Sequence, residues 1–141
     1  MDDPCFYGFP VFGERATKLA QDAGGKPVTA DTRTFVPDPA NTARVEGWAR
    51  RFLPQALGPV LYTRTCLYTL TPDRDFVIDT IPGHPAIAVA IGAGHAFKFA
   101  SVIGRILSEL ALRGASESDL TPFAITRPIL REKHPARSYM V

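Results

Sequence analysis

The strongest repeat of apolar positions lies near the C-terminal end of the chain and has helical spacing. Apolar side chains recur three or four residues apart, at Phe99, Val102, Ile103, Ile106, Leu107, Leu110 and Ala111. On a helix these side chains form one continuous apolar stripe. Gly114 follows, and glycine commonly ends helices because it adopts the left-handed conformation easily. The pattern predicts an amphipathic helix that ends at Gly114.

A second helical pattern lies in the first half of the chain. One helix face would carry Val45, Trp48, Ala49 and Phe52. Asn41 precedes them and is the expected N-cap, because its side chain can accept a hydrogen bond from a first-turn N–H group. A proline at position 54 and a glycine at position 58 then predict the end of the helix.

Other segments have the composition of strands and turns. Residues 5–13 are aromatic and interrupted by glycine and proline, which indicates a kinked or edge strand, and residues 15–21 predict a second short strand before a turn at 22–27. From residue 59 onward the sequence alternates, which predicts a strand with Tyr62, Arg64, Cys66 and Tyr68 on one face. A turn at 71–75 and apolar residues at 76–79 predict that this strand forms a hairpin.

The segment AIAVAIG, residues 86–92, is an unbroken apolar run typical of a strand covered on both faces. It leads through glycines into the predicted C-terminal helix, an arrangement that can bind an anion. GAGHAF resembles half of a dinucleotide-binding fingerprint, but Phe97 stands where the third glycine would be, and a tight turn accounts for the same residues. With a short extended segment within residues 119–128, the elements predict an α+β fold.

The composition is that of an ordinary globular protein. The chain of 141 residues is 45% hydrophobic and 21% charged, with a formal net charge of +2. The basic residues are scattered, so no nucleic-acid partner is expected. We expect no membrane span and no signal peptide, since long apolar runs are missing. Three widely separated histidines predict no metal site, and the presence of only two cysteines indicates the cytoplasm.

Three residues are candidates for chemistry, and each has a structural alternative. Cys66 either fills space as a buried thiol or carries a functional group. Lys98 would lie in the first turn of the predicted helix, where the helix dipole disfavours a cation, so it either reaches solvent or serves a ligand. His95 is either a polar cap of that helix or a site residue.

Four stretches match one family in order and approximate spacing. They are YGFPVFGERATKLA from Tyr7, CLYTLTPDRDFVID from Cys66, GAGHAFKFASVIGRILSELA from Gly92 and DLTPFAITRP from Asp119. Together they cover nearly the whole chain. The sequence resembles the C-terminal portion of the monomeric sarcosine oxidase and N-methyltryptophan oxidase family, which are FAD-dependent amine oxidases of the D-amino-acid-oxidase-like group. The combination of C-x-Y-T-x-T-P-D with G-H-x-F-K-F is specific.

The resemblance implies a covalently bound flavin. Cys66 would form a thioether to the 8α-methyl carbon of FAD, and Gly94 and His95 would pack near the flavin ring. Lys98 would lie at the same site. Lys18 would lie on the other side of the flavin, where a fixed positive charge favours reaction with O2.

The resemblance also implies a substrate and a reaction. Tyr7 and Tyr68 would line the substrate pocket, and Lys98 would bind the substrate carboxylate. The implied reaction is the FAD-dependent oxidation of a secondary (N-methyl) amino acid such as sarcosine, giving the amine, an aldehyde and hydrogen peroxide. Asp22 stands where some members carry a pocket histidine, so the amine itself stays open.

Members of the family are much longer than this chain, which would be the C-terminal part of a two-domain enzyme. Residues 1–82 would belong to the substrate-binding domain with its mixed sheet, and residues 83–141 would be a strand-helix segment of the FAD-binding domain. An N-terminal FAD-binding half would then be missing, leaving exposed apolar surface and unpaired strand edges that favour aggregation. The alternative is an inactive truncated remnant or interaction module that binds no flavin.

Overall fold

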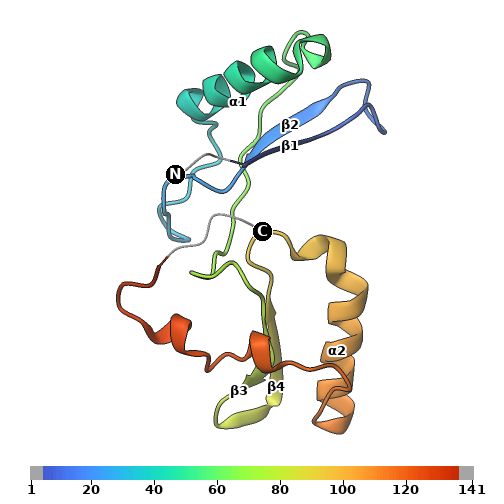
Figure 1. Cartoon of the computed structure of the whole chain (residues 1–141), viewed down its shortest axis with the longest axis vertical. Helices are drawn as coiled ribbons and strands as arrows, with labels where there is room; N and C mark the ends of the chain where they lie inside the picture. Colours follow the sequence, from blue (N-terminus) through green and yellow to red (C-terminus); the bar gives the residue numbers. More distant parts are fainter. Residues whose placement is uncertain (1–4, 137–141) are drawn as a thin grey trace. The chain divides into compact units, whose positions relative to one another are not determined.

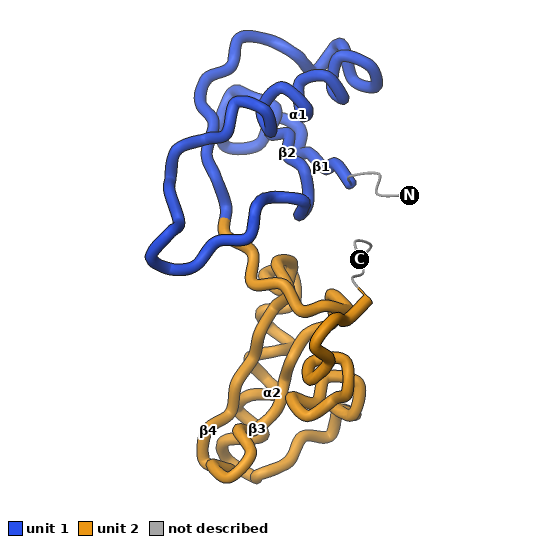
Figure 2. The backbone as a smooth tube through the Cα atoms, turned by 90° about the vertical axis from the view of Figure 1, so that its left-hand side faces the viewer, with its two compact units in different colours: residues 1–66 blue, residues 67–141 orange. Residues whose placement is uncertain are grey.

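The structure is a computed structural model that describes residues 5–136. The chain divides into two compact units, residues 1–66 and residues 67–141 (Figure 2). In the described part of the chain, each unit contains a two-stranded antiparallel sheet and one α-helix (Figure 1). The predicted mixture of helices and strands is confirmed. The domain boundary expected at residue 82 refers to the longer enzymes that the sequence resembles, and it stays a prediction.

The first unit begins with the predicted pair of short strands. β1 (Cys5–Phe9) pairs antiparallel with β2 (Lys18–Asp22), which places Phe9 opposite Lys18 and Tyr7 opposite Ala20. The second strand begins three residues later than predicted, at Lys18 rather than at residue 15. The hairpin therefore carries Tyr7 and Lys18 on neighbouring strands.

The helix of the first unit, α1 (Pro39–Phe52), begins earlier than expected. Its N-cap is Asp38, whose carboxylate accepts a hydrogen bond of 2.8 Å from the N–H of Ala40. The prediction of Asn41 as N-cap was wrong, because proline is favoured in the first helical turn and an aspartate directly before it caps the helix. The predicted apolar face is confirmed around Ala49, which is fully buried, and Trp48, whose ring stacks on Phe6 at 5.0 Å, whereas Phe52 at its end is 56% exposed.

The predicted strand around Cys66 is wrong. Within the described chain, residues 57–71 contain no strand. Instead β3 (Val77–Ile81) pairs antiparallel with β4 (His84–Ile91) across a tight turn in which Gly83 has a φ of 81°. A strand needs a hydrogen-bonding neighbour, and the apolar run that directly follows β3 supplies it. The placement of Cys66 and Tyr68 on one strand face therefore loses its basis.

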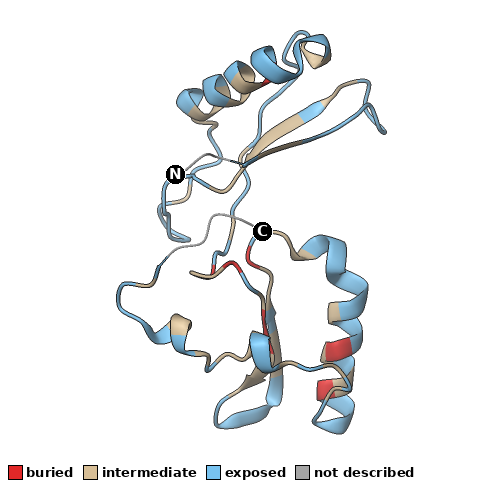
Figure 3. Cartoon of the chain, in the orientation of Figure 1, coloured by how far each residue is buried: buried red, intermediate tan, exposed pale blue. Residues whose placement is uncertain are grey.

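The core of the second unit lies between its sheet and α2 (Ala100–Arg113). Ile78 of β3 packs against Ile106 and Leu110 of α2, and these are among the buried residues in Figure 3. Gly114 ends the helix with a φ of 73°, as predicted. At about 25 cal/mol per Å² of apolar surface, burial of such side chains stabilises the unit by roughly 2 kcal/mol each.

β4 is not covered on both faces in this chain, contrary to the pattern of its sequence. Ile87 is 49% exposed, and within the described residues β4 pairs only with β3. Exposed apolar side chains continue on α2, where Leu112 is 84% exposed. This agrees with the expectation of exposed apolar surface, while aggregation stays a prediction.

The segment after α2 folds into turns rather than the predicted extended piece. Two short 3-10 helices occupy Thr121–Phe123 and Pro128–Arg131. Prolines at the starts of both turns favour this geometry, because proline fixes φ near its helical value. Across residues 5–136, none of the helices has both the length and the apolar character needed to span a membrane.

Candidate functional site

The chain reverses tightly between β4 and α2, at residues 92–95. Ala93 is fully buried with a φ of 47°, and Gly94 follows with a φ of 87°. The N–H of His95 closes the turn with a hydrogen bond of 2.9 Å to the carbonyl of Gly92. A Cβ at Gly94 would lie 2.6 Å from the ring of Tyr68. The turn thus needs small residues, as predicted, and it brings Gly94 and Tyr68 together.

His95 lies at the N-cap position of the 3-10 turn Ala96–Phe99, but its side chain lines a cavity instead of capping that turn. Its side chain makes no capping hydrogen bond to the 3-10 turn Ala96–Phe99 that follows. Nδ1 instead lies 3.2 Å from the carbonyl oxygen of Ala93, and the ring packs against Phe76 with centroids 4.8 Å apart. The interpretation of His95 as a cap is therefore wrong, and the ring is held from two sides.

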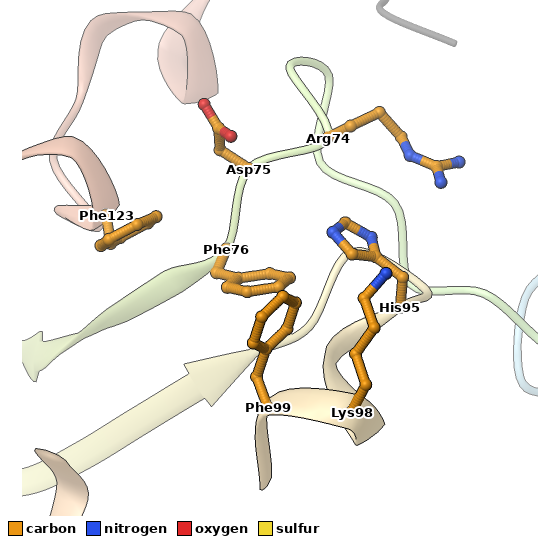
Figure 4. A pocket seen from close by; sticks show the side chains of 7 residues that line it. All are labelled: Arg74, Asp75, Phe76, His95, Lys98, Phe99 and Phe123. Carbon is orange, nitrogen blue, oxygen red and sulfur yellow. The ribbon is translucent and has the colours of Figure 1, made fainter. Parts of the chain in front are cut away.

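A cavity of about 160 Å³ opens beside this turn in the second unit (Figure 4). Its lining consists of Arg74, Asp75, Phe76, His95, Lys98, Phe99 and Phe123. Phe76 contacts the other two phenylalanine rings, at centroid distances of 5.5 Å to Phe99 and 6.2 Å to Phe123. The cavity therefore combines an aromatic wall with two cationic side chains, Arg74 and Lys98, and one carboxylate, Asp75.

Lys98 lies just before α2, not inside its first turn. It belongs to the 3-10 turn Ala96–Phe99, whereas α2 begins at Ala100. The side chain is exposed, and Nζ lies 5.4 Å from the ring centroid of Phe99. The first turn of α2 contains no acidic residue. The ammonium group and the positive end of the helix therefore act in the same sense and favour an anion.

The site residues predicted in the first unit include a lysine among aromatic rings. Nζ of Lys18 lies 5.7 Å from the ring centroid of Tyr7 and 5.5 Å from that of Phe9. Such distances are typical of cation–π contacts, which hold an ammonium group in a defined place. The β1–β2 hairpin therefore brings Tyr7 and Lys18 together.

Cys66 is an exposed free cysteine, so its interpretation as a buried space-filling residue is wrong.

Sequence reasoning missed a contact between the segment before Cys66 and the β1–β2 hairpin. The hydroxyl of Tyr62 donates a hydrogen bond of 2.6 Å to the Glu14 carboxylate, and this bond is the main reason why the pKa of Tyr62 is raised. No sequence signal marks the pair, because 48 residues separate its members.

Sequence reasoning also missed an ion pair beside the cavity. The Arg127 guanidinium donates from Nε and Nη2 to the two carboxylate oxygens of Asp73, at 2.7 and 3.0 Å. These hydrogen bonds hold the pKa of Asp73 below its usual value. Both residues lie in the stretches that carry the family resemblance, but nothing in the sequence indicates that they meet.

The predicted site residues are thus divided between the two units. The first unit holds Tyr7, Lys18 and Cys66, and the second holds Tyr68, Gly94, His95 and Lys98. Within the units, the structure brings together Tyr7 with Lys18, Tyr68 with Gly94, and His95 with Lys98 at the cavity.

Comparison with known proteins defines the class of this chain. Residues 2–110 match the family described as FAD dependent oxidoreductase (DAO), and the chain belongs to this family. It is 39% identical over 131 residues to monomeric sarcosine oxidase of Arthrobacter sp. (strain TE1826), covering 91% of this chain and 34% of that protein. It is also 39% identical over 125 residues to N-methyl-L-tryptophan oxidase of Escherichia coli O157:H7, covering 86% of this chain and 33% of that one.

A solved structure gives the same result for the fold. NikD, an unusual amino acid oxidase essential for nikkomycin biosynthesis, superposes in its open form with a TM-score of 0.72 at 29% identity. The match covers 92% of this chain and 35% of the NikD chain. The chain therefore spans about a third of the length of the relatives that it matches.

The described residues fit a share of a flavin site. The thiol of Cys66 is exposed, as a covalent bond to a cofactor would require. Gly94 is exposed at the turn, beside the ring of Tyr68. The Lys98 ammonium group stands before a helix whose first turn lacks acidic residues. The positive field at this turn suits a ring that gains negative charge on reduction.

Proposed function

We propose that this chain supplies the C-terminal, substrate-facing part of an FAD-dependent oxidase of secondary amino acids, such as sarcosine or another N-methyl amino acid. The observation that carries the proposal is Lys98 at the aromatic cavity beside the turn of Gly94 and His95. An ammonium group next to apolar rings matches an amino acid, which presents a carboxylate at one end and apolar groups at the other.

Lys98 is the partner of the substrate carboxylate in this proposal. An ammonium group binds a carboxylate strongly where water is excluded, because charge-assisted hydrogen bonds gain from a low local dielectric. Phe76 and Phe99 line the cavity wall beside Lys98 and would shield a bound carboxylate in part from water. Tyr68, which packs on Gly94, would contact the rest of the substrate, and we assign a substrate-binding role to Tyr7 of the first unit as well.

Cys66 would hold FAD covalently, and Gly94 and His95 would lie against the flavin ring. When bound, FAD supplies the electron-accepting chemistry that oxidises the C–N bond, with O2 as the final acceptor and hydrogen peroxide as a product. Lys18 keeps a positive charge in place between two aromatic rings. Such a charge stabilises the negative charge that develops on O2 during its reduction.

An N-terminal half that binds the ADP part of FAD is the expected partner, since relatives are about three times as long. We place the protein in the cytoplasm on the basis of Cys5 and Cys66, which are both free. We expect no nucleic-acid partner, because the basic residues are scattered along the sequence.

The deciding experiment examines the Cys66 peptide of natively purified protein, coexpressed with an N-terminal FAD-binding half. Trypsin should release residues 65–74 with the added mass of a flavin. Acid precipitation should leave yellow colour with the protein, and an N-methyl amino acid should produce hydrogen peroxide. Cys66→Ser should abolish the bound colour, whereas Cys5→Ser, at the other exposed cysteine, should keep it. An unmodified thiol in colourless protein would support the inactive remnant instead.

A further inference from the structure

The guanidinium of Arg127 uses every donor it has. Besides the two bonds to Asp73, Nη2 donates to the carbonyl of Asp75 at 3.1 Å. Nη1 donates to the carbonyls of Phe76 at 2.9 Å and Ala124 at 3.4 Å. The side chain is only 10% exposed. Five donors of one planar guanidinium, each with an acceptor, restrict the relative positions of the groups involved.

These acceptors lie next to two neighbouring parts of the cavity wall. Phe76 is one part, and Ala124 directly follows Phe123, which is the other. The rings of Phe76 and Phe123 stack with an interplanar angle of 28°. Phe76 precedes the β3–β4 ladder and Phe123 lies in the turn Thr121–Phe123, so neither is placed by ladder hydrogen bonds. One side chain therefore holds both parts of the wall in place.

The loop that carries Asp73 has a conformation that needs support. Arg74 has a φ of 65°, which costs a residue with a side chain about 1–2 kcal/mol. The hydroxyl of Thr71 donates to the carbonyl of Asp75 at 2.7 Å, the same oxygen that Arg127 contacts. The Arg127–Asp73 pair and the hydrogen bond from Thr71 to Asp75 together hold this turn in its strained conformation. This turn sets the position of Phe76 at the cavity.

We propose that Arg127 is a positioning residue for the carboxylate site: it holds Phe76 and Phe123 in place so that a carboxylate ligand in the cavity they help to line reaches Lys98. The inference rests on the proposed function for the nature of the ligand. Loss of Arg127 should loosen this arrangement without unfolding the unit, because the N–H of Ile125 still donates to Asp79 of β3 at 2.9 Å. Misplacement of a binding group by about 1 Å typically weakens its effect 10- to 100-fold.

The test measures binding of benzoate, an apolar ring with a carboxylate, to the full chain by NMR. The His95 ring resonances report binding, and they are assigned with His84→Gln and His134→Gln.

Arg127→Ala should raise the Kd about tenfold, and methylguanidinium should restore binding by filling the vacated space. Arg127→Lys, which keeps the charge but not the fork of donors, should fall in between. Arg131→Met, at an exposed arginine of the same segment, should bind like the unaltered chain.

Two controls separate this inference from the proposed function. If Lys98→Met binds benzoate as well as the unaltered chain, or if the unaltered chain shows no saturable shift, the carboxylate site is wrong and the role of Arg127 fails with it. If Lys98→Met weakens binding while Arg127→Ala and Arg127→Lys do not, only the positioning role is overturned. Loss of fold in both Arg127 variants, seen as collapsed amide dispersion, would likewise overturn it in favour of a purely structural role.

Discussion

The ring of Tyr68 packs directly on the backbone of Gly94, at the point where a side chain would otherwise begin. A Cβ added there would lie 2.6 Å from the ring, and the φ of 87° is unfavourable for any residue with a side chain. The glycine therefore has two structural effects. It permits the left-handed turn after β4, and it makes room for Tyr68, an aromatic residue predicted to line the substrate pocket.

Gly94→Ala should therefore destabilise the chain by about 2–3 kcal/mol, from backbone strain and overlap with Tyr68. Gly104→Ala is the matched control, because Gly104 lies in α2 with nothing within 4 Å of an added Cβ. That change should stabilise the helix by about 0.5–1 kcal/mol. Urea unfolding measures both. Adding Tyr68→Ala to Gly94→Ala should relieve the overlap with the ring but not the backbone strain. Equal effects of Gly94→Ala and Gly104→Ala on stability would contradict the packing of Tyr68 on Gly94.

The helices were predictable because their signals are local. The stripe that ends at Gly114 and the face around Ala49 both depend on neighbours three or four residues away. Even the misplaced start of α1 had a local signal, since Asp38 and Pro39 form a stronger start than Asn41. The prediction of a strand around Cys66 was wrong because a strand needs a hydrogen-bonding partner. The alternation of apolar and polar residues in one segment does not determine which other segment pairs with it.

The candidate site was predictable only where residues lie close in sequence or share a recognised motif. Gly94, His95 and Lys98 are close neighbours in the sequence, and the structure places them at one cavity or beside it. The pairs of Arg127 with Asp73 and of Tyr62 with Glu14 join residues 54 and 48 positions apart. Single charged residues at such separations carry no signal of pairing, so only the fold reveals them.

The Arg127–Asp73 pair should make stability depend on pH in the acid range. The hydrogen bond from Arg127 is the main cause of the lowered pKa of Asp73, whose ordinary value is 3.8. A carboxyl with a lowered folded-state pKa stabilises the fold above its ordinary pKa, and the stabilisation is lost as the pH falls through the folded-state value. Asp73→Asn should cost about 3 kcal/mol near pH 6, because it leaves Arg127 without its counter-ion.

The difference in unfolding free energy between Asp73→Asn and the unaltered chain should therefore shrink as the pH falls from about 5 toward 2. Denaturant unfolding at a series of pH values measures it. Asp31→Asn, at an exposed carboxylate, is the control and should follow the unaltered chain throughout. A difference that is independent of pH would show that Asp73 acts through packing rather than through its charge.

Tyr62 should ionise at higher pH than an ordinary tyrosine as long as Glu14 is charged beside it. The hydrogen bond to Glu14 is the largest cause of the raised pKa. The stabilisation from this bond is present below the ordinary pKa of 10.0 and is lost as the pH rises through the folded-state value. Glu14→Gln should lower the pKa of Tyr62 toward 10, measured from tyrosinate absorbance with Tyr62→Phe to identify its step. Glu46→Gln on α1 should leave the titration unaltered.

Lys98→Met in the assembled enzyme should distinguish carboxylate binding from a general effect on the site. Methionine keeps much of the side-chain volume but removes the charge, so a substrate that needs the ammonium group loses a charge-assisted hydrogen bond of about 1.5–3 kcal/mol. The KM of an N-methyl amino acid should rise roughly 10- to 100-fold, whereas the KM of a matched N-methyl amine that lacks the carboxylate should change little. Lys133→Met, at an exposed lysine far along the chain, is the matched control. Steady-state release of hydrogen peroxide gives both constants, and equal losses with the two substrates would mean that Lys98 does not hold the carboxylate.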